Sequence, residues 1–277
     1  MKFKIVSDSS SDIYQVSSVE YASVPLKIIT DNKEYVDNSD LDVIGMLSDL
    51  RSYKGKSHTS CPSSGEYLEA FGDAENVFVV TISSNLSGSY NSANVAAKTY
   101  LEDHPDRNVH IIDSLSTGAE SFIMIEKLCS LILEGKSFEE IKSEIIDYSV
   151  NHTRLIFALE SMRNLANNGR VSPVKAKMAE LLGIRAVGRA SDEGTLEMLC
   201  KSRGPLNTVK DILTNMESDG YKGGRVRIHH ANNLTSATMM KTKILEKFPE
   251  ASIETAECGG LCSFYAEEGG LLVGFEI

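Results

Sequence analysis

Positive charge and cysteine are both scarce in this chain of 277 residues. The 28 Lys and Arg residues stand against 39 Asp and Glu residues, and the net charge of -11 repels nucleic-acid phosphate. No dense basic tract offsets that charge, so we expect no nucleic-acid partner. The five cysteines are an odd number without a C-x-x-C pair. This pattern argues against a disulfide framework and against a metal site.

Long hydrophobic runs are also missing. The start, Met1 to Asp8, turns polar after a few residues and lacks the apolar stretch of a signal peptide. No later run approaches the length of a membrane span, so we expect a cytoplasmic protein with no membrane span. With 42% hydrophobic residues, the chain can build a real core, and its length predicts two domains.

The first half alternates strand and helix signals. Helices are predicted over Ser63–Phe71, Ser89–Leu101 and Gly118–Leu133, and a fourth begins after Ser137. Strands are predicted over Lys2–Ser7, Val77–Ile82 and Val109–Ile112. The βαβα order favours a parallel sheet. Residues 1–150 are therefore predicted to form an N-terminal α/β domain.

The second half has a different pattern of secondary-structure signals. Its predicted strands are Leu155–Leu159, Ile184–Ala190, Thr195–Lys201, Arg225–His230, Ser252–Glu257 and Leu271–Phe275. Asp192-Glu193-Gly194 predicts a hairpin turn, and helices are expected near 206–217 and 235–247. Residues 151–277 are therefore predicted to form an α+β domain with a mainly antiparallel sheet. The expected fold class is α/β, with a ligand crevice between the two domains.

Clusters of hydroxyl-bearing residues follow three predicted strands of the parallel sheet. They are Asp8–Asp12, Ser83–Ser89 and Asp113–Thr117, and a fourth cluster, Thr59–Ser63, precedes a helix. Each cluster alone is explained by helix caps and turns. Because parallel strands end on one edge of a sheet, however, the clusters also predict a ligand site there.

Ser87-Gly88 is the sharpest of these features. A strand-to-helix turn of small residues lets backbone N–H groups bind an anion at the positive end of a helix. Hydroxyls from Thr59 and Ser87 suit a single carboxylate. The phosphate-binding signatures G-x-x-x-x-G-K-[ST] and G-x-G-x-x-G are missing, so we favour carboxylate over phosphate.

Motifs along nearly the whole chain resemble the DegV family in their order. Ile5–Asp12 looks like its N-terminal motif, Val24-Pro25-Leu26 its next strand, and Thr59–Ser63 its T-S-Q-P-S segment with Cys61 in place of Gln. Ile82–Ala93 is similar to its most specific block. Ile112-Asp113-Ser114, Asn168–Ser172 and Leu182–Val187 follow in the family's order.

The resemblance implies a non-enzymatic carrier that holds a long-chain fatty acid and presents it to a separate fatty acid kinase, without a cofactor. The carboxylate would be held by Thr59, Ser87 and the Gly88 amide. Lys201-Ser202-Arg203 would dock the partner through Arg203, or would equally be a solvated strand end. The predicted ligand-binding residues are Thr59, Ser60, Ser63, Ser87, Gly88, Ser114, Arg170 and Tyr265. For Arg170, a surface ion pair is the competing interpretation.

One departure from the family lies near the C-terminus. Where the family carries G-P-x-x-G-x-H-x-G-P-G, this chain has Gly259–Gly269 with Tyr265 in place of the histidine. A phenol donates one hydrogen bond but brings no positive charge, and Glu267-Glu268 adds negative charge. The departure predicts altered head-group binding. The alternative is a solvated turn in which both glutamates point to water.

Two rival functions remain open from the sequence. Ser87 on a strand-turn-helix resembles a hydrolase nucleophile elbow, although Asn85 and Ser89 stand where glycines are expected. The second rival is a divergent homologue without lipid, acting as an interaction module. Among the histidines, His58 is the candidate for lining the pocket, and His229-His230 is expected to be packed or solvated.

Overall fold

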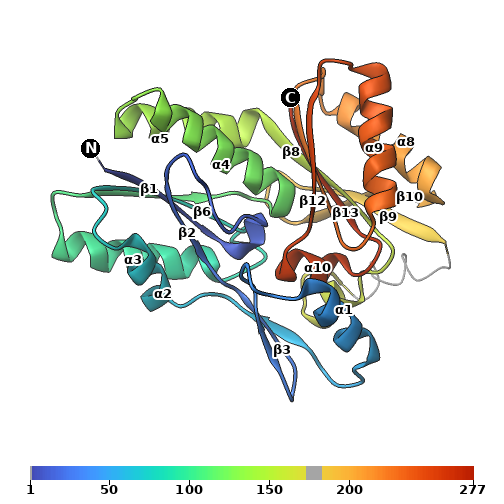
Figure 1. Cartoon of the computed structure of the whole chain (residues 1–277), viewed down its shortest axis with the longest axis horizontal. Coiled ribbons are helices and arrows are strands. Elements are labelled where there is room, and N and C mark those ends of the chain that lie inside the picture. The colour runs from blue at the N-terminus through green and yellow to red at the C-terminus, as the bar shows by residue number, and fades with distance from the viewer. Residues whose placement is uncertain (1, 173–182) are drawn as a thin grey trace.

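Two large β-sheets and helix α4 (Gly118–Leu133), which packs against both of them, organise the computed structural model (Figure 1). The structure describes residues 2–172 and 183–277. Leu182, the first residue of one family motif, lies outside these ranges. The first sheet is fully parallel in the order β2-β1-β6-β7. Its strands are β1 (Phe3–Asp8), β2 (Glu20–Val24), β6 (Asn76–Thr81) and β7 (Asn108–Asp113).

Both faces of the parallel sheet are covered by helices, which is why its strands are apolar on both sides. Side chains alternate along β6, so Val77 and Val79 pack against α2 (Ser64–Phe71) and α3 (Ser89–Asp103). Phe78 and Val80 face α4 and α5 (Phe138–Asn151) instead. The predicted Ser-x-x-Glu capping boxes form at the starts of α2 and α5. The predicted α/β architecture of this half is confirmed.

The second sheet has the order β10-β9-β8-β13-β11-β12, and every pair except β11-β12 is antiparallel. Its strands are β8 (Thr153–Leu159), β9 (Ile184–Ala190), β10 (Leu196–Arg203), β11 (Arg225–His230), β12 (Ser252–Glu257) and β13 (Leu271–Glu276). One face packs against α8 (Pro205–Ser218) and α9 (Leu234–Lys247), and α4 contacts the sheet through β8, β11 and β13. The predicted mainly antiparallel sheet is confirmed.

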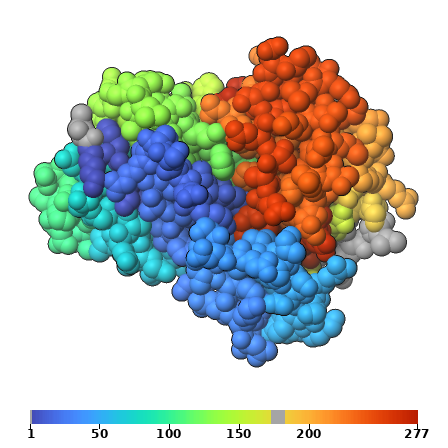
Figure 2. All heavy atoms as spheres, viewed as in Figure 1, coloured from blue at the N-terminus to red at the C-terminus, as the bar shows by residue number. Residues whose placement is uncertain are grey.

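A third, small antiparallel sheet is absent from the predictions. It consists of β3 (Lys27–Ile29), β4 (Glu34–Val36) and β5 (His58–Ser60). Helix α1 (Val43–Ser52) lies between β4 and β5 in the sequence. Pro25 separates it from β2, because proline lacks the N–H group that would continue the parallel ladder. Figure 2 shows this blue segment as a lobe that borders the red C-terminal segment.

The remaining short elements lie where this lobe meets the two halves. They are the 3-10 helix Ser9–Ser11, α6 (Arg163–Asn167) and α10 (Gly260–Ala266). Helix α10 contacts both α1 and β3, so the end of the chain packs on its beginning. The sheet type changes between α5 and β8, and the domain division at residue 150 stays a prediction. None of the helices in the described ranges is long and apolar enough to cross a bilayer.

Candidate ligand-binding site

An apolar cavity lies between the parallel sheet, the antiparallel sheet and α10. Its empty volume is about 770 Å³, part of which is open to solvent. The apolar lining residues are Leu26, Ile82, Leu86, Leu115, Leu155, Phe157, Leu159, Leu165, Ala190, Leu196, Leu261, Ala266 and Leu272. The cavity therefore suits a long, flexible hydrocarbon.

Ser116, Thr117 and Thr195 also line this cavity, together with four polar side chains from four separate segments that the sequence singled out. Thr59 lies on β5, Ser87 precedes α3, Arg170 follows α6, and Tyr265 lies on α10. The hydroxyl groups of Thr59 and Tyr265 are 2.7 Å apart and hydrogen-bonded. The guanidinium carbon of Arg170 lies 5.7 Å from the ring centroid of Tyr265. The sequence predicted all four as ligand-binding residues, and the structure brings them together.

The Arg170 guanidinium supplies positive charge at this polar end. Its Nε donates to the carbonyl oxygen of Leu86 at 3.1 Å, and Nη1 donates to that of Asn168 at 2.5 Å. Both acceptors are neutral, so these bonds orient the side chain without cancelling its charge. The ring face of Tyr265 adds a cation–π contact. A half-buried guanidinium held in this way favours an anionic ligand.

Tyr265 stays protonated in this environment. Burial raises the pKa of its phenol above the ordinary value, while Thr59 and Arg170 lower it by smaller amounts. A neutral phenol keeps its O–H donor, which it can direct to Thr59 or to a ligand oxygen. This end of the cavity therefore offers hydroxyl donors and one cation, a combination that suits a carboxylate.

A buried carboxylate fixes the turn that carries Ser87. Asp8, at the end of β1, accepts hydrogen bonds from the Ser89 hydroxyl at 2.6 Å and the Ile82 amide at 3.0 Å. Burial raises the pKa of Asp8, and these hydrogen bonds oppose that shift. The Ser87 hydroxyl accepts from the Ser89 amide at 3.3 Å. Ser87, which lines the cavity, therefore stands directly before the start of α3.

The other predicted ligand-binding residues lie outside the cavity lining. Ser60 donates to the Cys61 carbonyl, Ser63 caps α2, and buried Ser114 donates to the Ser116 carbonyl. Gly88 is exposed beside Cys61: a Cβ at this glycine would lie 3.3 Å from the Cys61 sulfur. These residues shape the turns around the site. Exposed His58 is not in the lining either, which contradicts its predicted place in the pocket.

The segment around Tyr265 is a buried helix and not a solvated turn, although half-exposed Glu268 does face solvent as the alternative expected. Glu267 accepts hydrogen bonds from the Ser161 hydroxyl at 2.8 Å and the Asn164 amide at 3.0 Å. Glu268 pairs with Arg51 at 2.9 Å. Both glutamates are engaged by partners outside the cavity lining, and this arrangement keeps their charge away from the site.

No described histidine forms a hydrogen bond to Ser87, so the nucleophile-elbow interpretation lacks its base. His229 instead bonds to Asp12 through Nδ1 at 2.8 Å, inside the interface between the halves. Arg203, predicted to dock a partner, is exposed at the end of β10. Within the described ranges, no group of His, Cys, Asp and Glu side chains could hold a metal ion.

The sequence did not identify most of the apolar residues that line the cavity. Leu155, Phe157 and Leu159 on β8 alternate along the strand, so all three face the cavity. This period of two was available in the sequence, but nothing in it showed which face would line a cavity. Asp12 and Asp37 were also missed: both are buried carboxylates that accept backbone N–H groups of the Gly259–Leu261 segment.

Known proteins resemble this chain over its full length. A DegV domain-containing protein of Streptococcus pneumoniae is 43% identical over all of both chains. The solved structure of the fatty acid kinase B3 protein of S. pneumoniae, loaded with linoleic acid, superposes with a TM-score of 0.98 at 43% identity and covers all of both chains. A DegV family protein from Eubacterium eligens loaded with heptadecanoic acid gives 0.97 at 43% identity, over 99% of each chain. The sequence profile described as "Uncharacterised protein, DegV family" matches residues 2–276, and the chain therefore belongs to the DegV family.

Proposed function

We propose that this protein binds a long-chain fatty acid non-covalently in the cavity between its two large sheets. The main support is that the cavity is apolar but has Thr59, Ser87, Arg170 and Tyr265 among its lining residues, and these form its polar end. The carboxylate accepts hydrogen bonds from the hydroxyls and faces the Arg170 charge. The two relatives solved with linoleic and heptadecanoic acid, each 43% identical, support this assignment.

The apolar and polar ends of the cavity make different contributions to binding. Burying each CH₂ group of an acyl chain contributes about 0.8 kcal/mol, so the tail supplies most of the affinity. The polar end adds orientation, since a carboxylate turned into the apolar end would lose its hydrogen bonds. This division predicts that head-group substitutions weaken binding without abolishing the contribution of the tail.

In this proposal the protein is a cytoplasmic carrier and carries out no chemistry itself. It presents the acid to a separate kinase, and exposed Arg203 at the end of β10 contacts that partner. The name of the fatty acid kinase B3 relative supports a kinase partner. The Ser87 hydrolase has no histidine base among the described residues, and a lipid-free interaction module would have no use for the cavity.

The direct test is denaturing extraction of the protein purified from a bacterial host, followed by mass spectrometry of the extract. We expect one fatty acid per chain, non-covalently bound. A matched preparation of Thr59→Ala with Ser87→Ala should retain clearly less acid, with Ser84→Ala, an exposed neighbour, as the control. Absence of acid, with no uptake of added acid, would overturn the proposal, and an acyl adduct on Ser87 would favour the hydrolase.

A further inference from the structure

Helix α10 carries much of the cavity wall but is short. It contributes Leu261, Cys262, Tyr265 and Ala266 to the lining. Leu261 and Tyr265 are four residues apart, so they lie on one side of the helix, about 6 Å apart along its axis. Neighbouring Phe264 is fully buried and packs with Ile28 and Met46 of the small lobe. The start of the helix therefore sets where the Tyr265 hydroxyl stands.

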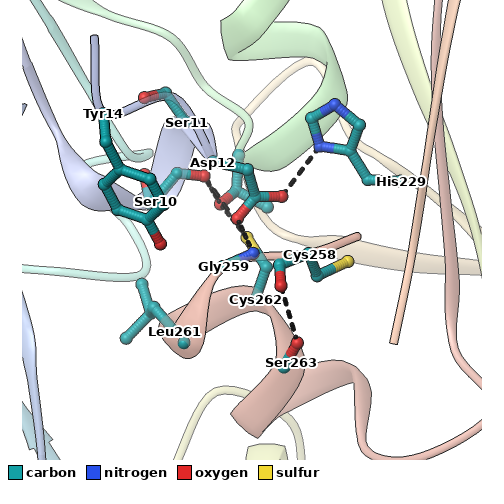
Figure 3. A network of polar contacts seen from close by, with 12 residues as sticks. Ser10, Ser11, Asp12, Tyr14, His229, Cys258, Gly259, Leu261, Cys262 and Ser263 are labelled. Carbon is teal, nitrogen blue, oxygen red and sulfur yellow. Dashed lines mark hydrogen bonds and ion pairs between the residues drawn. The ribbon is translucent and has the colours of Figure 1, made fainter. Parts of the chain in front are cut away.

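Two aspartates from the N-terminal half hold that start. Asp37, fully buried, accepts from the backbone amides of Gly260 at 2.6 Å and Leu261 at 3.0 Å. Asp12 accepts from the Gly259 amide at 2.8 Å and bonds to His229 on its other oxygen (Figure 3). The first amides of a helix have no partner within the helix, so these carboxylates complete them. Both aspartates lie more than 220 residues away in sequence from the amides they bind.

The two glycines at this point are explained by the same contacts. A Cβ at Gly260 would lie 2.8 Å from the Asp37 oxygen and 2.5 Å from Leu41. A Cβ at Gly259 would lie 2.2 Å from the Tyr14 hydroxyl. That hydroxyl donates a third hydrogen bond to Asp37, at 2.7 Å. The glycines let the backbone approach Asp37 and Tyr14 more closely than any side chain would allow. Asp37 accepts hydrogen bonds from three donors and is buried from solvent.

We propose that Asp37 is a positioning residue for fatty-acid binding: by anchoring the first turn of α10, it places the Tyr265 hydroxyl against Thr59 and the ligand carboxylate. Asp37 is not among the residues that line the cavity. Phe264 sets the rotation of the helix, and Asp37 sets its position along the axis. The inference rests on the proposed function and adds a residue outside the cavity lining.

The test compares Asp37→Asn with Asp40→Asn, an exposed aspartate three residues away. An asparagine presents only one acceptor and turns an NH₂ group toward the second amide, so the helix start must shift. We expect Asp37→Asn to weaken fatty-acid affinity about tenfold, in line with the loss of a hydrogen bond to a charged group. In the ligand-free protein, the NMR signal of the Tyr265 ring should move in Asp37→Asn and stay in Asp40→Asn.

A double-mutant cycle separates positioning from general stability. If Asp37 acts through Tyr265, adding Asp37→Asn to Tyr265→Phe should cost little further affinity, because the hydroxyl to be placed is already gone. Independent, multiplying losses would overturn the inference, as would an unmoved Tyr265 signal. Should Asp37→Asn fail to fold, Tyr14→Phe removes only one donor and should give a smaller loss in the same direction. If the wild-type protein binds no fatty acid, the proposed function is overturned. The Tyr265 NMR signal of the ligand-free protein still tests whether Asp37 positions Tyr265.

Discussion

Ser83 donates a hydrogen bond from its hydroxyl to the carbonyl oxygen of Gly194 at 2.6 Å, and this bond joins the end of β6 to the β9–β10 hairpin. Asn85 adds a second bond, from Nδ2 to the Glu193 carbonyl at 2.6 Å. Gly194 and Leu196 line the cavity. The hairpin tip is therefore one wall of the cavity, fastened to the opposite half by two side chains.

Removing this fastening should speed the release of bound acid. We expect Ser83→Ala with Asn85→Ala to raise the dissociation rate by up to about thirtyfold, because two hydrogen bonds of roughly 1 kcal/mol each are lost. Stopped-flow transfer of a fluorescent fatty acid to vesicles measures the rate, and Ser84→Ala is the control. An unchanged rate would mean that the acid leaves by another route.

Replacing Tyr265 with histidine should introduce a pH dependence that the wild type lacks. Burial raises the pKa of the Tyr265 phenol, so the phenol stays neutral. Wild-type affinity should stay flat from about pH 7 to about pH 9. The imidazole of Tyr265→His, with an ordinary pKa of about 6.5, is mostly neutral already at about pH 7, so that variant should bind more weakly at about pH 7.5 than at about pH 6, a fall with rising pH that the wild type lacks. Calorimetric titration at several pH values checks both profiles; a steep wild-type profile would show that another group titrates at the site.

Buried Glu120 on α4 should make the protein less stable as pH rises. Burial raises its pKa from 4.5 to about 7, with Ser116 and Thr153 opposing the shift. Because the folded state holds this proton more tightly, stability is full below pH 4.5 and is lost as pH rises toward 7, by on the order of 3 kcal/mol.

The matching variant is Glu120→Gln, which cannot ionise and keeps the acceptor for the Thr153 hydroxyl. The free energy of unfolding in urea, measured at about pH 5 and about pH 8, should rise for the variant relative to the wild type at the higher pH. A difference in unfolding free energy that does not change with pH would show that Glu120 ionises without penalty in the folded protein.

A tryptophan at Ala190 should shorten the cavity and report on it. Ala190 lies in the lining, and the chain has no tryptophan of its own. Ala190→Trp should lose more affinity for acids of about eighteen carbons than for shorter ones, since each excluded CH₂ forfeits about 0.8 kcal/mol. Tryptophan fluorescence during titration measures binding, and Leu234→Trp, exposed on α9, is the control. Equal losses for all chain lengths would place the tail elsewhere.

Local signals predicted the large elements well. The apolar run of β6 and the capping boxes of Ser63 and Ser137 are properties of short segments, so they can be read without tertiary context. Strands β3, β4 and β5 have three residues each, too few for a periodic signal. They form only because Pro25 ends the parallel ladder and buried Ile28 finds a core with Phe264.

The site was predicted where hydroxyl clusters and family motifs coincide, as for Thr59 and Ser87. Resemblance alone pointed to Arg170 and Tyr265, and their mutual contact depends on α10, a helix of seven residues. The role of Asp37 could not be read from the sequence, because its partners, the amides of Gly260 and Leu261, are backbone groups far along the chain.

The bond from Asp12 to the Gly259 amide closes a loop of 247 residues. Contacts between such distant segments form late in folding, because the chain must lose much conformational entropy before they bring any stabilisation. The two large sheets can gather their own strands before α10 docks, whereas the Thr59–Tyr265 pair cannot form until it does. We therefore expect the binding site to assemble last, and a folding intermediate that has both sheets but an undocked α10 should be unable to hold lipid.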